Sequence, residues 1–146
     1  RSTLFPYTTL FRSERCLLDY YAQSNPAHKR RVLIYGTGRT ASLLIRELQY
    51  NQRHSMTPVG FIDDDRKKKR KLMHGYPVLG SFEVLAEVLE KGGVQELIIA
   101  TTKLPPDRLE QVKQISHQHN VIVRQFSVSI ERLSQQTTDE PILSLH

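Results

Sequence analysis

One feature constrains the fold of this chain most. It is a short apolar run that leads into a glycine turn and then into a helical pattern. The run occupies residues 31–48, RVLIYGTGRTASLLIREL, and a second apolar run at 59–65 ends in three aspartates. A strand, a glycine turn and a helix in this order let backbone amides approach a phosphate, and a carboxylate after the next strand can accept hydrogen bonds from ribose hydroxyls. The sequence therefore predicts a nucleotide-binding α/β domain.

The rest of the chain continues the alternation of strands and helices. We expect strands at 31–35, 58–63, 75–80, 96–101 and 121–126, and helices at 38–50, 82–91 and 107–119. Ser81 is a candidate N-cap for the second helix, and the charged residues 64–71 are expected to form a loop. Because such crossovers are right-handed, we expect a Rossmann-like, three-layer, doubly wound parallel sheet of about five strands in the order 3-2-1-4-5.

The glycine turn matches a GxGxxA version of the dinucleotide fingerprint. In that pattern the first glycine permits the tight turn, and the second has no side chain to block a phosphate. The glycines could instead serve only the turn of a domain that binds no ligand. The predicted phosphate-binding residues are Gly36, Thr37, Gly38, Arg39 and Thr40.

Two more groups of polar residues are expected at the same edge of the sheet. Asp63 and Asp64 follow the second predicted strand, and Thr101, Thr102 and Lys103 follow the fourth. Open α/β sheets bind ligands at the carboxyl ends of their strands, at the point where the strand order reverses. The alternatives are a solvated acidic turn for the aspartates and an ordinary loop for residues 101–103.

The positive charge of the chain is concentrated in one segment. The net charge is +6, and the run 66–71, RKKKRK, carries six positive charges. This run could contact a 2′-phosphate, a diphosphate or anionic lipid, but we favour a solvated loop partly neutralised by the aspartates. A nucleic-acid partner is not expected, because basic residues are not spread over a surface.

No recognisable catalytic or metal-binding set accompanies the glycine turn. The chain has neither a GxSxG nor an HExxH motif, and none of its six tyrosines is followed by lysine at the fourth position. The single cysteine, Cys16, cannot form a disulfide within the chain. We therefore assign no catalytic residue and no metal ligand.

The two ends of the chain differ from its middle. Residues 3–13, TLFPYTTLFRS, resemble letter for letter the translation of a sequencing adapter, and we expect residues 1–13 to be an artefact. We expect residues 14–30 to be an amphipathic leader and linker from a missing upstream, membrane-bound domain. Residues 31–126 then form the Rossmann-like domain, and 127–146 form a polar tail.

The combined pattern RRVLIYGTGRTASLLIREL, PVGFIDDD, HGYPVLGSFEVL and VQELIIAT resembles a known family. It is similar to the Rossmann-like, CoA-binding-like domain attached to membrane-bound bacterial polysaccharide biosynthesis enzymes. The resemblance covers residues 29–126, and Gly36, Gly38 and Asp63 match the family's nucleotide cradle. It implies NAD(P) or a nucleotide-sugar as the ligand, and a location on the cytoplasmic face of the bacterial inner membrane.

Members of this family occur in several settings. The segment 13–23, SERCLLDYYAQ, resembles the segment after the last membrane span of multi-span transferases, and residues 127–146 are mainly polar. We therefore favour a non-catalytic nucleotide-binding module in the C-terminal part of a polyprenyl-phosphate sugar-1-phosphate transferase-like protein. The alternative is the N-terminal domain of a membrane nucleotide-sugar dehydratase or epimerase.

Three other functions stay open from the sequence. The chain could be a complete small oxidoreductase or epimerase, although its length and the missing Tyr-x-x-x-Lys pair argue against this. It could be a ligand-sensing regulatory domain of the kind found on ion channels or redox-sensing repressors. It could also be a scaffold domain, and a homodimer is compatible with each of these functions.

Overall fold

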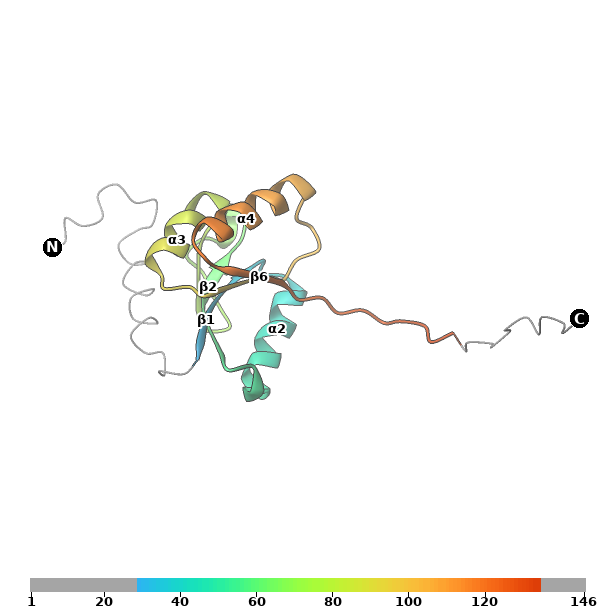
Figure 1. Cartoon of the computed structure of the whole chain (residues 1–146). Helices are drawn as coiled ribbons and strands as arrows, with labels where there is room; N and C mark the ends of the chain where they lie inside the picture. The colour runs from blue at the N-terminus through green and yellow to red at the C-terminus, as the bar shows by residue number, and fades with distance from the viewer. Residues whose placement is uncertain (1–28, 135–146) are drawn as a thin grey trace, which may run out of the picture.

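The computed structural model describes residues 29–134, which form three layers (Figure 1). A six-stranded sheet lies between helix α2 (Arg39–Tyr50) on one face and helices α3 (Leu85–Lys91) and α4 (Pro106–Gln118) on the other. The strand order across the sheet is β3-β4-β2-β1-β5-β6. The strands are β1 (Arg30–Tyr35), β2 (Met56–Ile62), β3 (Leu72–Met73), β4 (Tyr76–Gly80), β5 (Glu96–Ile99) and β6 (Ile122–Gln125).

The parallel part of the sheet confirms the prediction. Strands β4, β2, β1, β5 and β6 run parallel in the predicted order. The sequence did not predict β3, which pairs antiparallel with β4 at one edge. The expected loop 64–71 instead contains the 3-10 turn η3 (Arg66–Lys68) and leads directly into β3. The chain can reverse there because His74 and Gly75 both adopt positive φ angles, of 54° and 86°.

Several element boundaries also differ from the prediction. The strand predicted at 58–63 begins at Met56, after the 3-10 turn η2 (Gln52–His54), and the strand predicted at 96–101 ends at Ile99. The helix predicted at 82–91 is divided into the 3-10 turn η4 (Phe82–Val84) and α3.

Ser81 occupies the predicted N-cap position, but of the 3-10 turn η4. Its side chain makes no capping hydrogen bond. The carboxylate of Asp64 accepts the hydrogen bond of the Phe82 N–H over 3.0 Å instead. A carboxylate from the end of β2 therefore serves the start of this turn, which local sequence spacing does not reveal.

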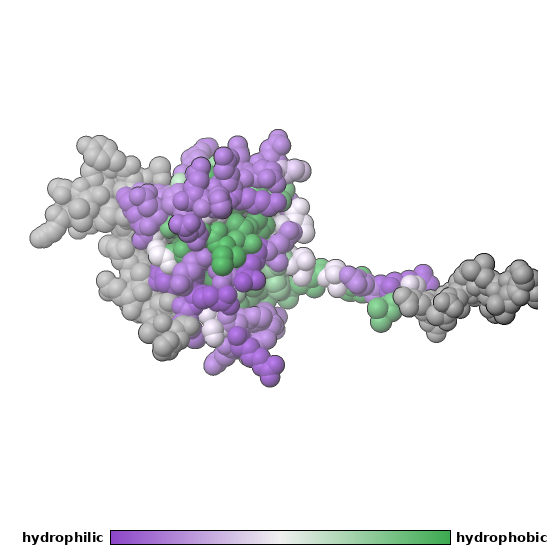
Figure 2. All heavy atoms as spheres, viewed as in Figure 1, coloured by the Kyte–Doolittle hydropathy of each residue, from purple (hydrophilic) through white to green (hydrophobic). Residues whose placement is uncertain are grey.

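The core lies on both faces of the sheet, as strand alternation requires. In β1, Val32 and Ile34 pack with Leu44 and Ile45 of α2, while Leu33 packs with the cluster beneath α3 and α4. Figure 2 shows hydrophilic residues over α4 and an apolar patch between α4 and β6. Since β1 is buried on both faces, it fixes the position of the turn that follows it.

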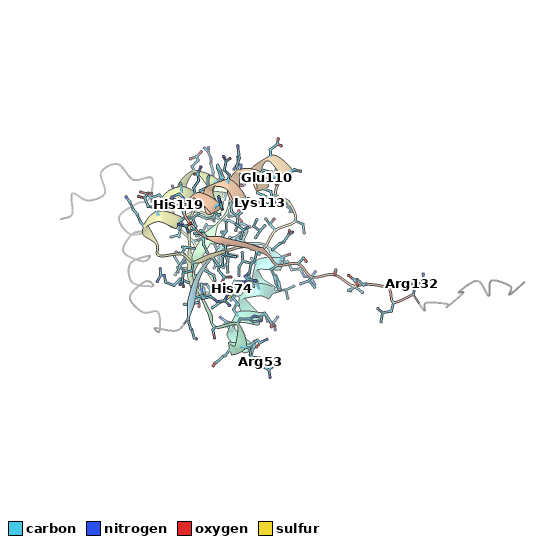
Figure 3. All side chains as sticks on the ribbon, viewed as in Figure 1. Arg53, His74, Glu110, Lys113, His119 and Arg132 are labelled. Carbon is cyan, nitrogen blue, oxygen red and sulfur yellow. The ribbon has the colours of Figure 1, made fainter. Side chains whose placement is uncertain are left out.

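The chain leaves the domain after β6. The exposed residues 127–134 run outward in an irregular, extended form that carries Arg132 away from the sheet (Figures 1 and 3). The expected artefact 1–13, the leader up to residue 28 and the tail from residue 135 lie outside the described residues. Among residues 29–134, no helix has the length and apolar character needed to cross a bilayer.

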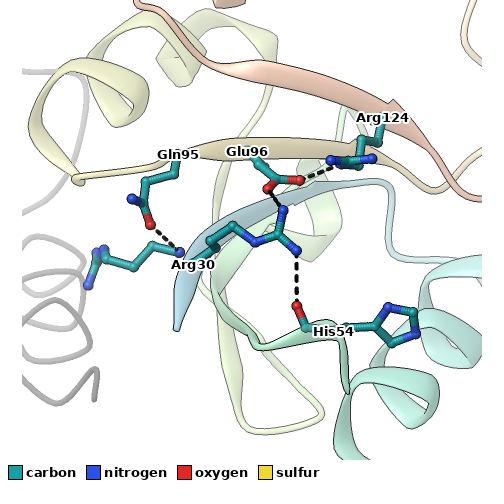
Figure 4. Close-up of polar contacts among 6 residues, drawn as sticks. Arg30, His54, Gln95, Glu96 and Arg124 are labelled. Atoms are coloured by element: carbon teal, nitrogen blue, oxygen red, sulfur yellow. Dashed lines mark hydrogen bonds and ion pairs between the residues drawn. The ribbon is translucent and has the colours of Figure 1, made fainter. Parts of the chain in front are cut away.

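A buried carboxylate links three strands on the face of the sheet that carries α2 (Figure 4). The side chain of Glu96 is 1% exposed, and Arg30 and Arg124 each donate to a different oxygen of it. The Arg124 contact is 2.6 Å long, and Arg30 also donates to the carbonyl of His54 over 3.0 Å. Because an unpaired buried carboxylate is very unfavourable, the two guanidinium groups are what permit Glu96 to lie in the sheet.

We expect Glu96→Gln to lower the free energy of unfolding by about 1–3 kcal/mol, because a neutral amide cannot satisfy two guanidinium groups. Glu110→Gln is the matched control. Glu110 pairs with Lys113 on the outer surface of α4 over 3.1 Å (Figure 3), and exposed pairs contribute about 0–1 kcal/mol. Urea unfolding measures both effects, and equal losses would contradict a special role for the buried carboxylate.

Candidate functional site

The carboxyl ends of β1, β2 and β5 surround a pocket of about 490 Å³. It lies where the strand order reverses beside β1, the place where open parallel sheets bind ligands. The structure brings all ten sequence-predicted site residues together in its wall. These are Gly36, Thr37, Gly38, Arg39, Thr40, Asp63, Asp64, Thr101, Thr102 and Lys103.

Gly36 is required by the fold itself. Its φ of +109° lies in the region that L-residues avoid, and a Cβ at this position would lie 2.9 Å from the carbonyl oxygen of Ala100. Its N–H donates to the carbonyl of Ile62 over 2.7 Å. The turn therefore lies tightly between the ends of β2 and β5, with no room for a side chain.

Gly38 differs from Gly36, because no feature of the fold requires a glycine there. Its φ of −79° suits any residue, and a Cβ at this position would have no atom within 4 Å. Gly38 lines the pocket and precedes α2, whose first turn has no side-chain cap and no acidic residue. The first N–H groups of a helix and its dipole favour an anion. A glycine here leaves space for a group placed against these amides.

Asp63 connects the glycine turn to the end of β2. One of its oxygens accepts a hydrogen bond from the Thr37 hydroxyl, and the other accepts one from the Asp65 N–H over 2.7 Å. The ammonium group of Lys68 lies 3.9 Å from the first oxygen. Because a carboxylate has about four lone-pair sites, Asp63 can still accept a hydrogen bond from a ligand hydroxyl.

Asp64 is the centre of a second group of polar contacts, which joins β1, η4 and α4. It accepts hydrogen bonds from the Tyr35 hydroxyl over 2.8 Å and from the Phe82 N–H, and Arg108 Nη1 lies 3.6 Å away. The guanidinium carbon of Arg108 lies 4.2 Å from the centre of the Phe82 ring. Asp64 therefore holds the wall of the pocket together, in addition to lining it.

Sequence reasoning missed two residues of this arrangement, Tyr35 and Arg108. Tyr35 lies at the end of an apolar run and lines the pocket, whereas Arg108 lies in an ordinary amphipathic helix. The only available signal was the position of Tyr35, immediately before the first glycine of the motif.

Burial and the hydrogen bond to Asp64 raise the pKa of the Tyr35 phenol above its ordinary value of 10.0. Because the folded state favours the protonated phenol, it gains stability that is fully present below the pKa of an unfolded tyrosine, about 10. This stability is lost as the pH rises through the higher pKa of Tyr35 in the folded state. We expect Tyr35→Phe to remove part of the decrease in stability above pH 10. Urea unfolding at several alkaline pH values measures this, with Tyr50→Phe at an exposed tyrosine as the control.

Three cationic side chains from different segments line the pocket: Arg39, Lys68 and Lys103. Lys68 brings one member of the basic run 66–71 into the pocket, next to Asp63. The hydroxyl of Thr101 accepts a hydrogen bond from the Lys103 N–H over 3.1 Å and so shapes the loop after β5. The pocket thus combines positive charge with carboxylates, which suits a ligand that carries both phosphates and hydroxyl groups.

No metal site is evident in the described part of the chain. Within residues 29–134, no three His, Cys, Asp or Glu side chains are grouped to hold a metal ion. The chemistry that the described pocket offers is the binding of anions and hydroxyl groups.

Comparison with protein families and curated proteins gives consistent matches. A family described as the CoA-binding domain matches residues 7–126. The capsular polysaccharide biosynthesis protein CapD of Staphylococcus aureus is 33% identical over 96 residues, which are 65% of this chain and 16% of CapD. The probable polysaccharide biosynthesis protein EpsC of Bacillus subtilis (strain 168) is 34% identical over 80 residues, 55% of this chain and 13% of EpsC. The chain therefore spans less than a fifth of either relative.

Comparison with solved structures supports the same fold. UDP-D-quinovosamine 4-dehydrogenase from Vibrio fischeri superposes with a TM-score of 0.59 and 25% identity, over 68% of this chain and 79% of that one. The Rex-family repressor RSP superposes with a TM-score of 0.58 and 10% identity, over 73% of this chain and 49% of RSP. RSP in complex with β-NADH gives a TM-score of 0.57. At 10% identity, the likeness to RSP shows the fold alone.

Proposed function

This chain belongs to the CoA-binding domain family, and from that premise we propose that it binds a nucleotide, NAD(P) or a nucleotide-sugar, without catalysing a reaction itself. It is related to the polysaccharide biosynthesis proteins CapD and EpsC. The binding site is the pocket at the carboxyl ends of β1, β2 and β5.

The contrast between the two glycines is the observation that carries this proposal. Gly36 is explained by its backbone angle and by the nearby Ala100 carbonyl, whereas nothing within the fold requires Gly38. The space beside Gly38 opens into the pocket at the uncapped start of α2. A phosphate group at this position would explain both the glycine and the uncapped helix.

The other pocket residues fit the remaining parts of a nucleotide. Arg39 and Lys103 would neutralise the phosphates from the two sides of the reversal point. Asp63, held by Thr37, would accept hydrogen bonds from the ribose hydroxyls. Tyr35 stays protonated at neutral pH and already donates to Asp64, so its role is to support the wall.

The larger protein is proposed to act in cell-envelope polysaccharide synthesis, at the cytoplasmic face of the bacterial inner membrane. The names of CapD and EpsC support the pathway, and the likeness to a UDP-sugar dehydrogenase supports a nucleotide-sugar enzyme. A polyprenyl-phosphate sugar-1-phosphate transferase-like protein is the second proposal for the larger protein. It rests on the sequence of the leader, 13–23, and on the polar residues 127–146.

Thermal unfolding of the full chain with NAD, NADP, UDP-sugars, ATP and CoA tests the proposed binding. A ligand at 100 times its dissociation constant should stabilise the folded state by about 2.7 kcal/mol, which raises the unfolding midpoint. A rise with one class of ligand would identify the nucleotide. If every ligand left the midpoint unchanged at millimolar concentration, the pocket would not be a nucleotide site.

A further inference from the structure

The two edges of the sheet are built in different ways. At one edge, β3 is only two residues long, and the basic residues Arg70 and Lys71 precede it and already pair with Val78 of β4. Short, basic edge strands discourage the addition of another strand. At the other edge, β6 is the last strand of the sheet among the described residues. It contains no proline, its one basic residue, Arg124, is bound to Glu96, and its first residue, Ile122, is 55% exposed.

The backbone of β6 presents hydrogen-bonding groups at this open edge. The N–H groups of Ile122 and Phe126 donate inward to β5, to the carbonyls of Gln95 and Ile99 over 3.2 and 2.9 Å. Because successive residues of a strand point their backbone groups to opposite sides, those of Val123 and Gln125 point away from β5. A further strand could therefore pair with β6.

The surface around β6 carries apolar side chains among polar ones. A groove of about 370 Å³ lies between α4 and β6, with Leu109 and Val123 in its wall, where Figure 2 shows the apolar patch. Beyond Phe126, the extended chain keeps alternating apolar and polar residues, and Val128 is 62% exposed. Exposed apolar side chains thus occur both in β6 and beyond the end of β5.

We propose that β6 is the interface between two copies of this chain, which pair antiparallel about a two-fold axis at Gln125. This register places Ile122 opposite Val128 of the second copy, and Arg124 opposite its Phe126. Ile122 and Val128 then form an apolar cross-strand pair on each side of the axis, and Phe126 lies beside Arg124, whose guanidinium group stays bound to Glu96.

The same register satisfies the backbone. The hydrogen-bonded pairs of the ladder are then Gln125 with Gln125 and Val123 with Ser127. In this register these residues carry the backbone groups that point outward. The two-fold axis also keeps the faces of the two sheets aligned, so that α2 of both copies lies on one side. This self-complementarity is the reason to choose a second copy over another partner.

Disulfide cross-linking tests the register in the full chain after Cys16→Ser. The Cα atoms of Gln125 in the two copies would lie about 5.5 Å apart, within disulfide range, so Gln125→Cys should cross-link rapidly under mild oxidation. Ser127→Cys is the matched control, because its two Cα atoms would lie about 14 Å apart. If both cysteines cross-linked at the same rate, the contact would be random collision and the proposed register would be wrong.

Sedimentation equilibrium tests the interface itself. The full chain should show twice its monomer mass at high concentration, and Ile122→Lys should return it to a monomer. Gln125→Pro should do the same, because it removes an outward donor but no bond to β5. Leu72→Lys, at the opposite edge and 61% exposed, should leave the dimer intact. A monomer at every concentration, or a dimer lost only with Leu72→Lys, would overturn the proposal.

Discussion

Gly36→Ala is expected to lower the free energy of unfolding by about 3–4 kcal/mol, a large fraction of the stability of a domain of this size. Two effects add at this position. The backbone has a φ of +109°, which strains any L-residue, and the new Cβ would meet the Ala100 carbonyl at 2.9 Å. Because that carbonyl belongs to the end of β5, the turn and the strand would have to separate. Urea unfolding followed by circular dichroism measures the loss.

Gly75→Ala separates the two effects. Gly75 also has a positive φ, +86°, but a Cβ there would have no atom within 4 Å. We expect it to show the backbone strain alone, about 1–2 kcal/mol. If Gly36→Ala proved no more destabilising than Gly75→Ala, the close approach of the turn to β5 would not matter for stability.

These two glycines show how far the sequence could predict the fold. The motif around Gly36 is local, so its strand, turn and helix could be recognised from residue order alone. The positive φ of Gly75 serves the reversal from β3 into β4, and β3 is a strand of only two residues. Such an element is too short to leave a periodic signal and is defined by its pairing with β4.

In the candidate site too, the sequence predicts some features and not others. Spacing and topology were sufficient to bring ten predicted residues to one pocket, since each follows a strand that ends at the same edge. The hydrogen-bond partners were not predictable, because Asp64 contacts Tyr35 and Phe82, which lie 29 and 18 positions away in the sequence. The sequence assigned the aspartates to a ligand, and the structure adds that they also hold the loops around the pocket.

Gly38→Val is expected to abolish nucleotide binding and leave the domain folded. In the parent chain, a ligand at 100 times its dissociation constant would stabilise the folded state by about 2.7 kcal/mol, and the variant should lose all of this. The reason is steric, because the valine side chain would occupy the space beside the first amides of α2, where we place a phosphate. Thermal unfolding with and without the ligand found for the parent chain measures the loss.

The unliganded variant provides the control within the same experiment. The φ of −79° at Gly38 suits valine, and a Cβ at this position has no atom within 4 Å. The substitution should therefore destabilise the free domain by about 1 kcal/mol or less, as expected for a poorer helix N-cap. A variant that remained folded and kept the full ligand-induced shift would place the nucleotide away from this turn. Gly38 would then be explained by the preference for glycine at a helix N-cap alone.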